Sequence, residues 1–205
     1  MELDSHTPSG GRYLIHSLYF DDYKDTSVYT TDSGLSERFK WRIRYYGDDL
    51  SYIVLERKEK KDGRCHKKSC KITANEYNSI VSGNIIDIVY DTEKDLIKEL
   101  AADMLIRNYR PKVIVDYERI AYVEEITNVR ITFDMRISAS YELEKFLDGN
   151  YQSFYIMPSG INVLEVKFDE ILPSYIRNIV ESFGFKQTSF SKYYYGRKIL
   201  DCYMR

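Results

Sequence analysis

Residues 37–46 read Glu-Arg-Phe-Lys-Trp-Arg-Ile-Arg-Tyr-Tyr, in which charged side chains alternate with mostly apolar or aromatic ones. In a β-strand, side chains two positions apart share a face. One face of this predicted strand therefore carries a row of cations, at Arg38, Lys40, Arg42 and Arg44. The other face is mostly apolar or aromatic, at Phe39, Trp41, Ile43 and Tyr45. Neighbouring cations in the row would stand about 6.6–6.8 Å apart.

Other predicted strands divide in the same way into an ionic face and a largely apolar face. The further ionic faces contain Glu56, Lys58 and Lys60; Lys67, Ser69 and Lys71; Tyr117 and Arg119; Arg130, Thr132, Asp134 and Arg136; Glu165 and Lys167. A solvated sheet surface would explain any one of them. Four like charges in line, however, repel one another unless an anion neutralises them. The pattern favours a β-barrel with ionic residues inside and apolar residues outside, which inverts the usual arrangement.

The remaining periodicity predicts an α+β protein dominated by antiparallel strands, with helices packed outside. Strands are expected over residues 12–20, 37–46, 50–60, 64–73, 112–123, 129–137 and 162–169. Helices are expected over residues 73–82 and 91–108, from Pro173 to about residue 182, and from residue 189 onward. We assign residues 1–11 to a disordered or residual N-terminal segment and residues 12–205 to one domain.

Length and composition exclude several classes of protein. With 43% hydrophobic and 15% aromatic residues, the chain of 205 residues is not intrinsically disordered. No run reaches the roughly 18–20 apolar residues of a membrane span. A net charge of −2 argues against a globally basic nucleic-acid binder. The cysteines, Cys65, Cys70 and Cys202, lack the spacing of a zinc site and predict free thiols in the cytoplasm.

An interior lined with arginine and lysine requires an anionic ligand, and both side chains bind phosphate well. Carboxylates on the same faces, at Glu56, Asp134 and Glu165, are poor direct partners for phosphate. They could act as oxygen ligands of a divalent cation that bridges to phosphate. The alternative is a salt bridge from each carboxylate to a neighbouring arginine or lysine.

Seven segments, in chain order, resemble motifs of the VTC (vacuolar transporter chaperone) domain. They are Y-L-I-H-S-L-Y-F-D at 13–21, R-F-K-W-R-I-R-Y-Y-G at 38–47, L-E-R-K-E-K at 55–60, Y-E-R-I-A-Y at 117–122, R-I-T-F-D at 130–134, L-E-V-K-F at 164–168 and S-K-Y at 191–193. That family belongs to the triphosphate tunnel metalloenzymes. The resemblance implies a tunnel of antiparallel strands, which agrees with the inverted barrel.

The resemblance also implies an activity, the synthesis of inorganic polyphosphate from the γ-phosphate of ATP. It implies a divalent metal, most often Mn²⁺ with Mg²⁺ as the alternative, and it suggests a membrane protein as a partner. By motif, the residues that hold the triphosphate would be Arg42, Arg44, Lys58, Arg119, Arg130 and Lys192, with Lys67 or Lys71. Tyr117 would line the tunnel and Glu165 would bind the metal. The face pattern adds Lys40 and Lys167 to the substrate site and Glu56 as a second candidate ligand.

The N-terminal region departs from the family pattern. Family members begin with a further strand near a motif R-x-E-x-K-Y, which supplies a lysine and a glutamate to the tunnel. Here residues 1–11 precede the first matching strand, and Glu2 has no partner motif. We therefore expect a tunnel that lacks its first strand, with an open sheet edge and with reduced or absent polymerase activity.

Three other functions are compatible with the pattern. Water as the acceptor would give a metal-dependent triphosphate or nucleotide hydrolase. A missing strand would favour a non-catalytic module that binds polyphosphate or nucleotide. A single-stranded nucleic-acid binder is disfavoured, because Phe39, Trp41 and Tyr45 lie opposite the cations, whereas stacking and backbone contacts would share one surface.

Overall fold

The computed structural model describes residues 1–5, 7–8, 10–185 and 187–203. It confirms the predicted α+β class. The strands form one antiparallel sheet in the order β5 (Arg64–Ile72), β4 (Asp49–Lys61), β3 (Arg38–Tyr46), β2 (Tyr13–Asp21), β6 (Arg110–Glu124), β7 (Val129–Ser140) and β8 (Phe154–Tyr155). Two further strands join this sheet, β1 (Glu2–Leu3) on β6 and β9 (Val163–Lys167) on β7.

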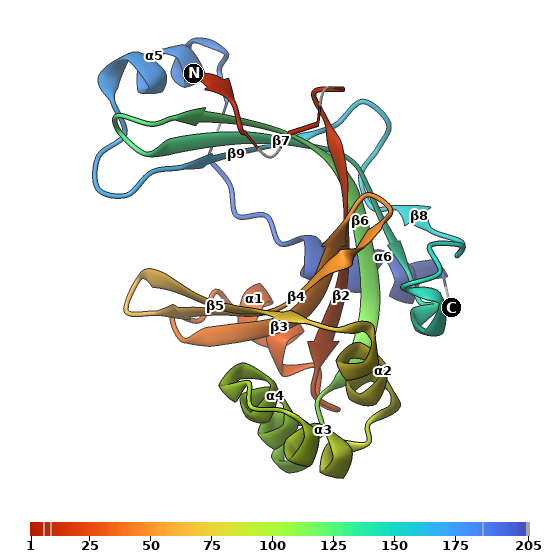
Figure 1. Ribbon diagram of the computed structural model, residues 1–205. Helices are drawn as coiled ribbons and strands as arrows, with labels where there is room; N and C mark the ends of the chain where they lie inside the picture. Colours follow the sequence, from red (N-terminus) through yellow and green to blue (C-terminus); the bar gives the residue numbers. More distant parts are fainter. Residues whose placement is uncertain (6, 9, 186, 204–205) are drawn as a thin grey trace.

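The sheet curls into two arms that face each other (Figure 1). Strands β3, β4 and β5 form the lower arm, β7 and β9 form the upper arm, and β2 and β6 join them. The curl is tunnel-like but not closed, because no pairing joins β5 to β9 in the described part of the chain.

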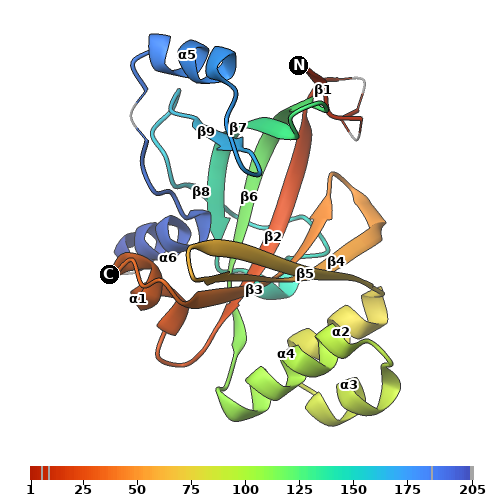
Figure 2. The ribbon, with the colours of Figure 1, turned by 90° about the vertical axis from the view of Figure 1, so that its left-hand side faces the viewer.

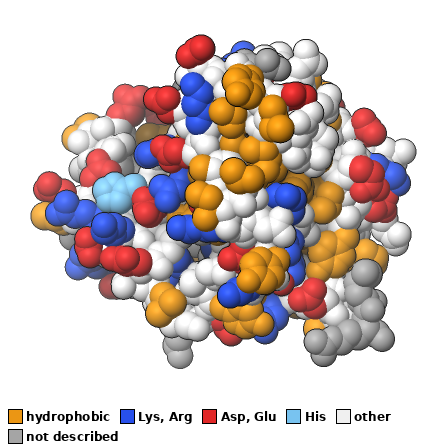
Figure 3. All heavy atoms as spheres, turned by 90° about the horizontal axis from the view of Figure 1, so that it is seen from below, with side chains coloured by type: hydrophobic (Ala, Val, Ile, Leu, Met, Phe, Trp, Pro, Cys, Tyr) orange, Lys and Arg blue, Asp and Glu red, His pale blue; other side chains and the backbone are white. Residues whose placement is uncertain are grey.

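Helices cover the outer side of the lower arm. They are α2 (Ala74–Ser82), α3 (Ile85–Asp91) and α4 (Asp95–Ile106). The predicted apolar face packs against them, and Trp41, Ile43 and Leu55 are fully buried in that core. Seen from below (Figure 3), apolar side chains remain at the surface of these helices, while Lys and Arg gather where the β4–β5 hairpin projects. The apolar face thus lies outside and the ionic face inside, as predicted.

The concave side of β6 and β7 is covered by the C-terminal helix α6 (Lys192–Tyr203). Gly196 makes this close packing possible: a Cβ atom there would lie 3.2 Å from Val115 Cγ2 and 3.4 Å from Ala139 Cβ. Figure 2 shows α6 beside the curled sheet and α5 (Ser174–Ser182) at its upper end. A short α1 (Thr26–Asp32), which the sequence pattern missed, precedes β3 and contacts α6.

Further segments differ from the prediction. The helix expected over 91–108 is confirmed as α4, but it begins at Asp95, because the chain is extended at Thr92. The helix α3, which ends just before Thr92, was not predicted. Thr92 accepts a hydrogen bond from the Lys94 backbone, which favours a turn over a continuous helix. At the N-terminus, Glu2 and Leu3 form a short strand on β6, beside the ends of β6 and β7 (Figure 2). Residues 6 and 9 of the predicted N-terminal segment lie outside the described residues.

Candidate functional site

One ion-pair cluster of the interior surrounds Glu56, which β4 places on the inner face. Its Oε2 lies 2.5 Å from Arg42 Nε and 3.6 Å from Arg44 Nε, and its Oε1 lies 3.6 Å from Lys67 Nζ. These residues meet because Arg42 pairs with Glu56 across β3 and β4. Burial alone would raise the pKa of Glu56, but the charges of Arg42 and Arg44 lower it to about 2.

A second cluster surrounds Asp134 on the upper arm. Arg119 donates from Nε and Nη2 to the two carboxylate oxygens at 2.6 and 2.8 Å. Lys192, at the start of α6, places its Nζ 2.6 Å from Oδ2. Asp134 is fully buried, which would raise its pKa, but the Arg119 hydrogen bonds and the Lys192 charge lower it. The carboxylate therefore orients two of the predicted triphosphate ligands.

Tyr117 joins the two clusters. Its hydroxyl accepts a hydrogen bond from Arg44 Nη2 at 3.4 Å. Lys192 Nζ and Arg119 Cζ lie over its ring, 4.6 and 5.2 Å from the centroid. Both distances fall within the range of a cation–π interaction. The side chain thus lines the interior between the lower and the upper arm.

Glu165 on β9 is more accessible than the interior carboxylates of Glu56 and Asp134. Its oxygens lie 3.4 Å from Lys167 Nζ and 3.8 Å from Arg119 Nη2, and 35% of the side chain is exposed. Burial would raise the pKa of Glu165, but nearby cations, led by Lys167, hold it below its usual range. Lys58 on β4 is among these cations, so the two arms face each other across the interior.

Lys40 and Arg130 extend the interior surface on the two arms. Lys40 Nζ donates to Ser191 Oγ at 2.9 Å, and burial together with the charges of Arg38 and Lys58 lowers its pKa to about 7. Arg130 Nη2 lies 2.8 Å from Asp4 Oδ2 and 3.4 Å from the Tyr13 hydroxyl. Arg130 pairs with Lys167 across β7 and β9.

The structure brings most of the predicted site residues together, with one exception. Lys71 lies at the end of β5, with its Nζ 5.6 Å from the ring centroid of Tyr52. Tyr19, which the site prediction missed, accepts a hydrogen bond from Arg42 Nη1 at 3.2 Å. Burial would raise the pKa of Tyr19, but the charges of Arg42 and Arg44 lower it. The period-two pattern of β2 could have found Tyr19, because it shares the inner face with Ser17.

The oxygen donors of the interior limit how a divalent metal, which the family resemblance implies, could be held. Among the described residues, no group of three or more His, Cys, Asp or Glu side chains could hold a metal ion. Mg²⁺ commonly binds one or two carboxylates together with the phosphates of the substrate. Glu165 suits that arrangement, because it is partly exposed and its ion pairs are long. Glu56 is already held by Arg42 and Arg44.

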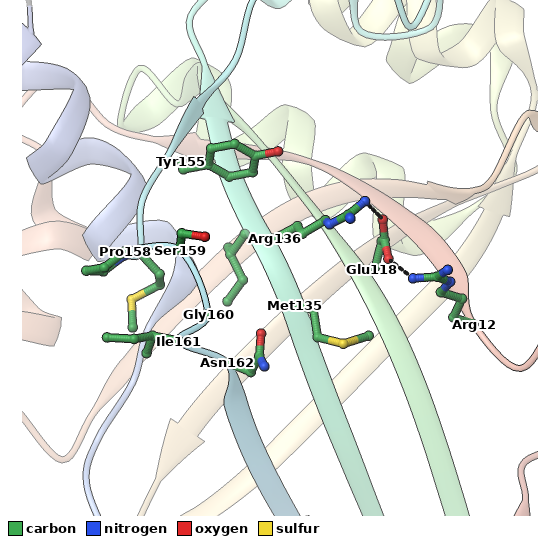
Figure 4. Close-up of a pocket in the computed structure, with 12 residues that line it drawn as sticks. Arg12, Glu118, Met135, Arg136, Tyr155, Pro158, Ser159, Gly160, Ile161 and Asn162 are labelled. Carbon is green, nitrogen blue, oxygen red and sulfur yellow. Dashed lines mark hydrogen bonds and ion pairs between the residues drawn. The ribbon is translucent and has the colours of Figure 1, made fainter.

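A cavity of about 590 Å³ lies outside the tunnel, between β7 and the segment that precedes β9 (Figure 4). In it, Arg136 and Arg12 point to the carboxylate of Glu118, at 3.0 and 3.1 Å. None of the predicted site residues lines this cavity. The cations of the predicted site converge in the tunnel-like interior and not in this cavity.

The family comparison agrees with this geometry. The model of the VTC domain matches residues 1–201. The chain belongs to the VTC-domain family. No curated protein matched the chain. The match extends over the N-terminal segment that contains β1, so this VTC domain includes residues upstream of the first recognised motif.

Solved structures share the fold of this VTC domain. One is described as a putative adenylyl cyclase from Hippeastrum with a dominant triphosphatase activity; it is 14% identical, with a TM-score of 0.52. Another is a putative adenylate cyclase from Bacillus halodurans, 13% identical, with a TM-score of 0.53. Each match covers 91% of this chain and 82% of the other. Across the described residues, no helix is long and apolar enough to cross a membrane.

Proposed function

We propose that this VTC domain binds a triphosphate in its interior and transfers the terminal phosphoryl group of ATP to a polyphosphate chain. The observation that carries the proposal is the convergence of cations from both arms and from α6 on one inner surface. Interior cations outnumber the carboxylates beside them, which are Asp4, Glu56, Asp134 and Glu165. A polyanionic guest would balance the remaining positive charge.

Buried donors without a hydrogen-bond partner support the same conclusion. Arg130 Nε and Thr132 Oγ1 have no hydrogen-bond partner among the described residues, and Arg44 Nε makes only a long ion pair of 3.6 Å with Glu56 in that part of the chain. Buried polar groups in proteins are normally hydrogen-bonded. The inner surface therefore has hydrogen-bonding capacity that the protein itself does not satisfy, as expected of a site built for an oxygen-rich ligand.

Phosphoryl transfer needs little covalent chemistry from the protein. It needs negative charge to be neutralised on the phosphate oxygens and the attacking and leaving oxygens to be aligned. Arg42, Arg44 and Lys67 would hold the triphosphate from the lower arm, and Arg119 and Lys192 from the upper arm. A divalent metal bound by Glu165 and the phosphates, Mn²⁺ or Mg²⁺, would supply further charge neutralisation.

The acceptor distinguishes two activities on this site. The end of a polyphosphate chain as acceptor gives the polymerase that the family resemblance implies. Water as acceptor gives a triphosphatase, and the open side of the sheet between β5 and β9 favours water access. The structural relative from Hippeastrum, itself described with a dominant triphosphatase activity, supports this second candidate. A cytoplasmic location and a membrane-protein partner stay predictions.

Product analysis tests the proposal. The purified protein is incubated with ATP and Mn²⁺ or Mg²⁺, and phosphate chains are resolved on urea gels while orthophosphate is followed by ³¹P NMR. Chains support the polymerase and orthophosphate alone supports the triphosphatase. Binding of tripolyphosphate without turnover would instead identify a binding module. Arg42→Met serves as the control for contaminating enzymes, because it removes a proposed triphosphate ligand and should lose turnover.

A further inference from the structure

A group of tyrosines lies on the same inner face as the cations, at one end of the tunnel. This tyrosine rim consists of Tyr13, Tyr46 and Tyr52. The ring centroids of Tyr13 and Tyr46 are 6.1 Å apart, and those of Tyr46 and Tyr52 are 6.4 Å apart. The rings come from β2 and from the β3–β4 hairpin, so the fold brings them together at one mouth.

The tyrosine rim is connected directly to the arginines of the candidate triphosphate site. The Tyr46 hydroxyl accepts from Arg44 Nη1 at 3.4 Å, and the Tyr13 hydroxyl accepts from Arg130 Nη2 at 3.4 Å. Arg44 also reaches Tyr117 and Glu56. A ligand whose phosphates bind these arginines would therefore place whatever group follows its phosphates near the tyrosine rim.

The rim is partly open to solvent. Tyr52 is 50% exposed, and Tyr13 and Tyr46 are half-buried. Lys71 Nζ approaches the Tyr52 ring, 5.6 Å from its centroid, and the exposed half of the side chain remains available for stacking. Any nucleic-acid base can stack on such a ring, because every base has a flat π-face. The opposite face of the sheet carries Phe39, Trp41 and Tyr45, but helices cover it and it offers no such surface.

The other end of the tunnel has a different chemistry. Along β3 and β4, the inner side chains run from Tyr46 and Tyr52 through Arg44, Arg42 and Glu56 to Lys40 and Lys58, and finally to Arg38 and Lys60. Lys67 on β5 stands beside Lys58. The turns at the two ends of β4 lie at opposite sides of the lower arm (Figure 1). The interior therefore has a direction, from aromatic groups through the guanidinium groups of Arg44 and Arg42 to a row of lysines that ends beside Arg38.

We infer that the tyrosine rim binds the base of a nucleoside triphosphate, with the phosphates running inward along the arginines and the terminal phosphate directed to the row of Lys40, Lys58 and Lys67. This inference rests on the proposed function and extends it in two ways. It assigns the base of the proposed ATP donor to a defined set of side chains, the tyrosine rim. It also fixes the orientation of that donor, since among the described residues the aromatic surface joined to the phosphate-site arginines lies at the mouth that the tyrosine rim forms.

The test compares two ligands on the full chain. Affinities for ATP and for inorganic tripolyphosphate are measured by calorimetry, with the same divalent cation, for the wild type, Tyr52→Ala and Tyr52→Phe. Loss of one stacking partner should weaken ATP binding by about 5- to 150-fold. Tripolyphosphate affinity should stay within about twofold, and Tyr52→Phe should bind ATP like the wild type. The matched control is Tyr90→Ala on α3, where the side chain is 84% exposed on the outer helices.

A second measurement tests directly whether the base of ATP stacks on the tyrosine rim. Stacking on a tyrosine ring should move the H2 and H8 proton resonances of ATP upfield on binding, and Tyr52→Ala should reduce that shift. Unchanged ATP affinity in Tyr52→Ala, or an equal loss for ATP and tripolyphosphate, would overturn the inference and leave the proposed function standing. Failure of the wild type to bind tripolyphosphate would instead overturn the proposed function itself.

Discussion

Arg119 and Asp134 face each other on neighbouring strands, and the guanidinium donates to both carboxylate oxygens of a fully buried aspartate. Lys192 binds the same carboxylate from α6. One side chain thus connects β6, β7 and the C-terminal helix. It also orients two cations of the candidate triphosphate site toward the interior, so stability and ligand binding depend on the same ion pairs.

Asp134→Asn should destabilise the protein strongly. Removing one partner of a buried ion pair costs about 3–5 kcal/mol, because the remaining charge is left uncompensated. Arg119 and Lys192 would both lose their partner. The measurement is the free energy of unfolding in urea. Glu118→Gln is the control: its partners Arg12 and Arg136 are exposed on the outer face, so the loss should be below about 1 kcal/mol. Equal losses in the two variants would contradict the expectation.

Two adjacent lysines on β5 should respond differently to substitution. Lys67 points inward to Glu56, whereas Lys68 points outward to Glu99 on α4. Lys67→Met should weaken tripolyphosphate binding by roughly two- to fivefold, a small effect because the side chain is partly exposed. Lys68→Met removes the same charge from the same strand and should leave affinity unchanged. Equal effects in calorimetry would show that binding follows net charge, not the inner face.

Tripolyphosphate binding should depend on pH through Lys40. With a pKa of about 7, this amine is mostly neutral at pH 8 in the free protein. A bound polyanion favours the ammonium form, so binding at pH 8 takes up a proton and affinity falls as pH rises above about 7. Calorimetry in buffers with different ionisation enthalpies measures the uptake. Lys40→Arg keeps the charge at all these pH values and should bind without that uptake; persistence of the uptake would exclude Lys40 as its source.

Glu165→Gln should separate turnover from binding. Lys167 and the other nearby cations hold the pKa of Glu165 below its usual range, so the side chain is an ionised oxygen ligand at neutral pH. The variant should lose metal-dependent turnover by at least about 10- to 100-fold and keep its affinity for tripolyphosphate in the absence of metal. The control is Glu59→Gln, an equally exposed glutamate on the outer face of β4. Unchanged turnover in Glu165→Gln would exclude Glu165 as the metal ligand.

The sequence predicted that the ionic face of the sheet lies inside, because strand periodicity is a local property. The barrel that it favoured is present as a tunnel-like curl that is not closed between β5 and β9 among the described residues. Alternation over residues 37–46 assigns Arg42 and Trp41 to opposite faces, and the register of β3 against β4 confirms it. The helix expected over 91–108 is present as α4, but its start was placed about one turn too early, because periodicity does not reveal the turn at Thr92. The short pairing of Glu2 and Leu3 with β6 could not be predicted, because two residues are too few to show strand periodicity.

Alternation along each strand was enough to predict which side chains share a face, and hence a cationic interior, while the motifs predicted the family. Which of those side chains meet depends on the tertiary structure. The curl brings Lys58 of β4 within electrostatic range of Glu165 of β9, and α6 carries Lys192 to Asp134. The same curl gathers Tyr13 with Tyr46 and Tyr52 at one mouth and leaves Lys71 there as well. Periodicity fixes the direction of a side chain, but contacts between distant strands depend on how far the sheet twists and closes.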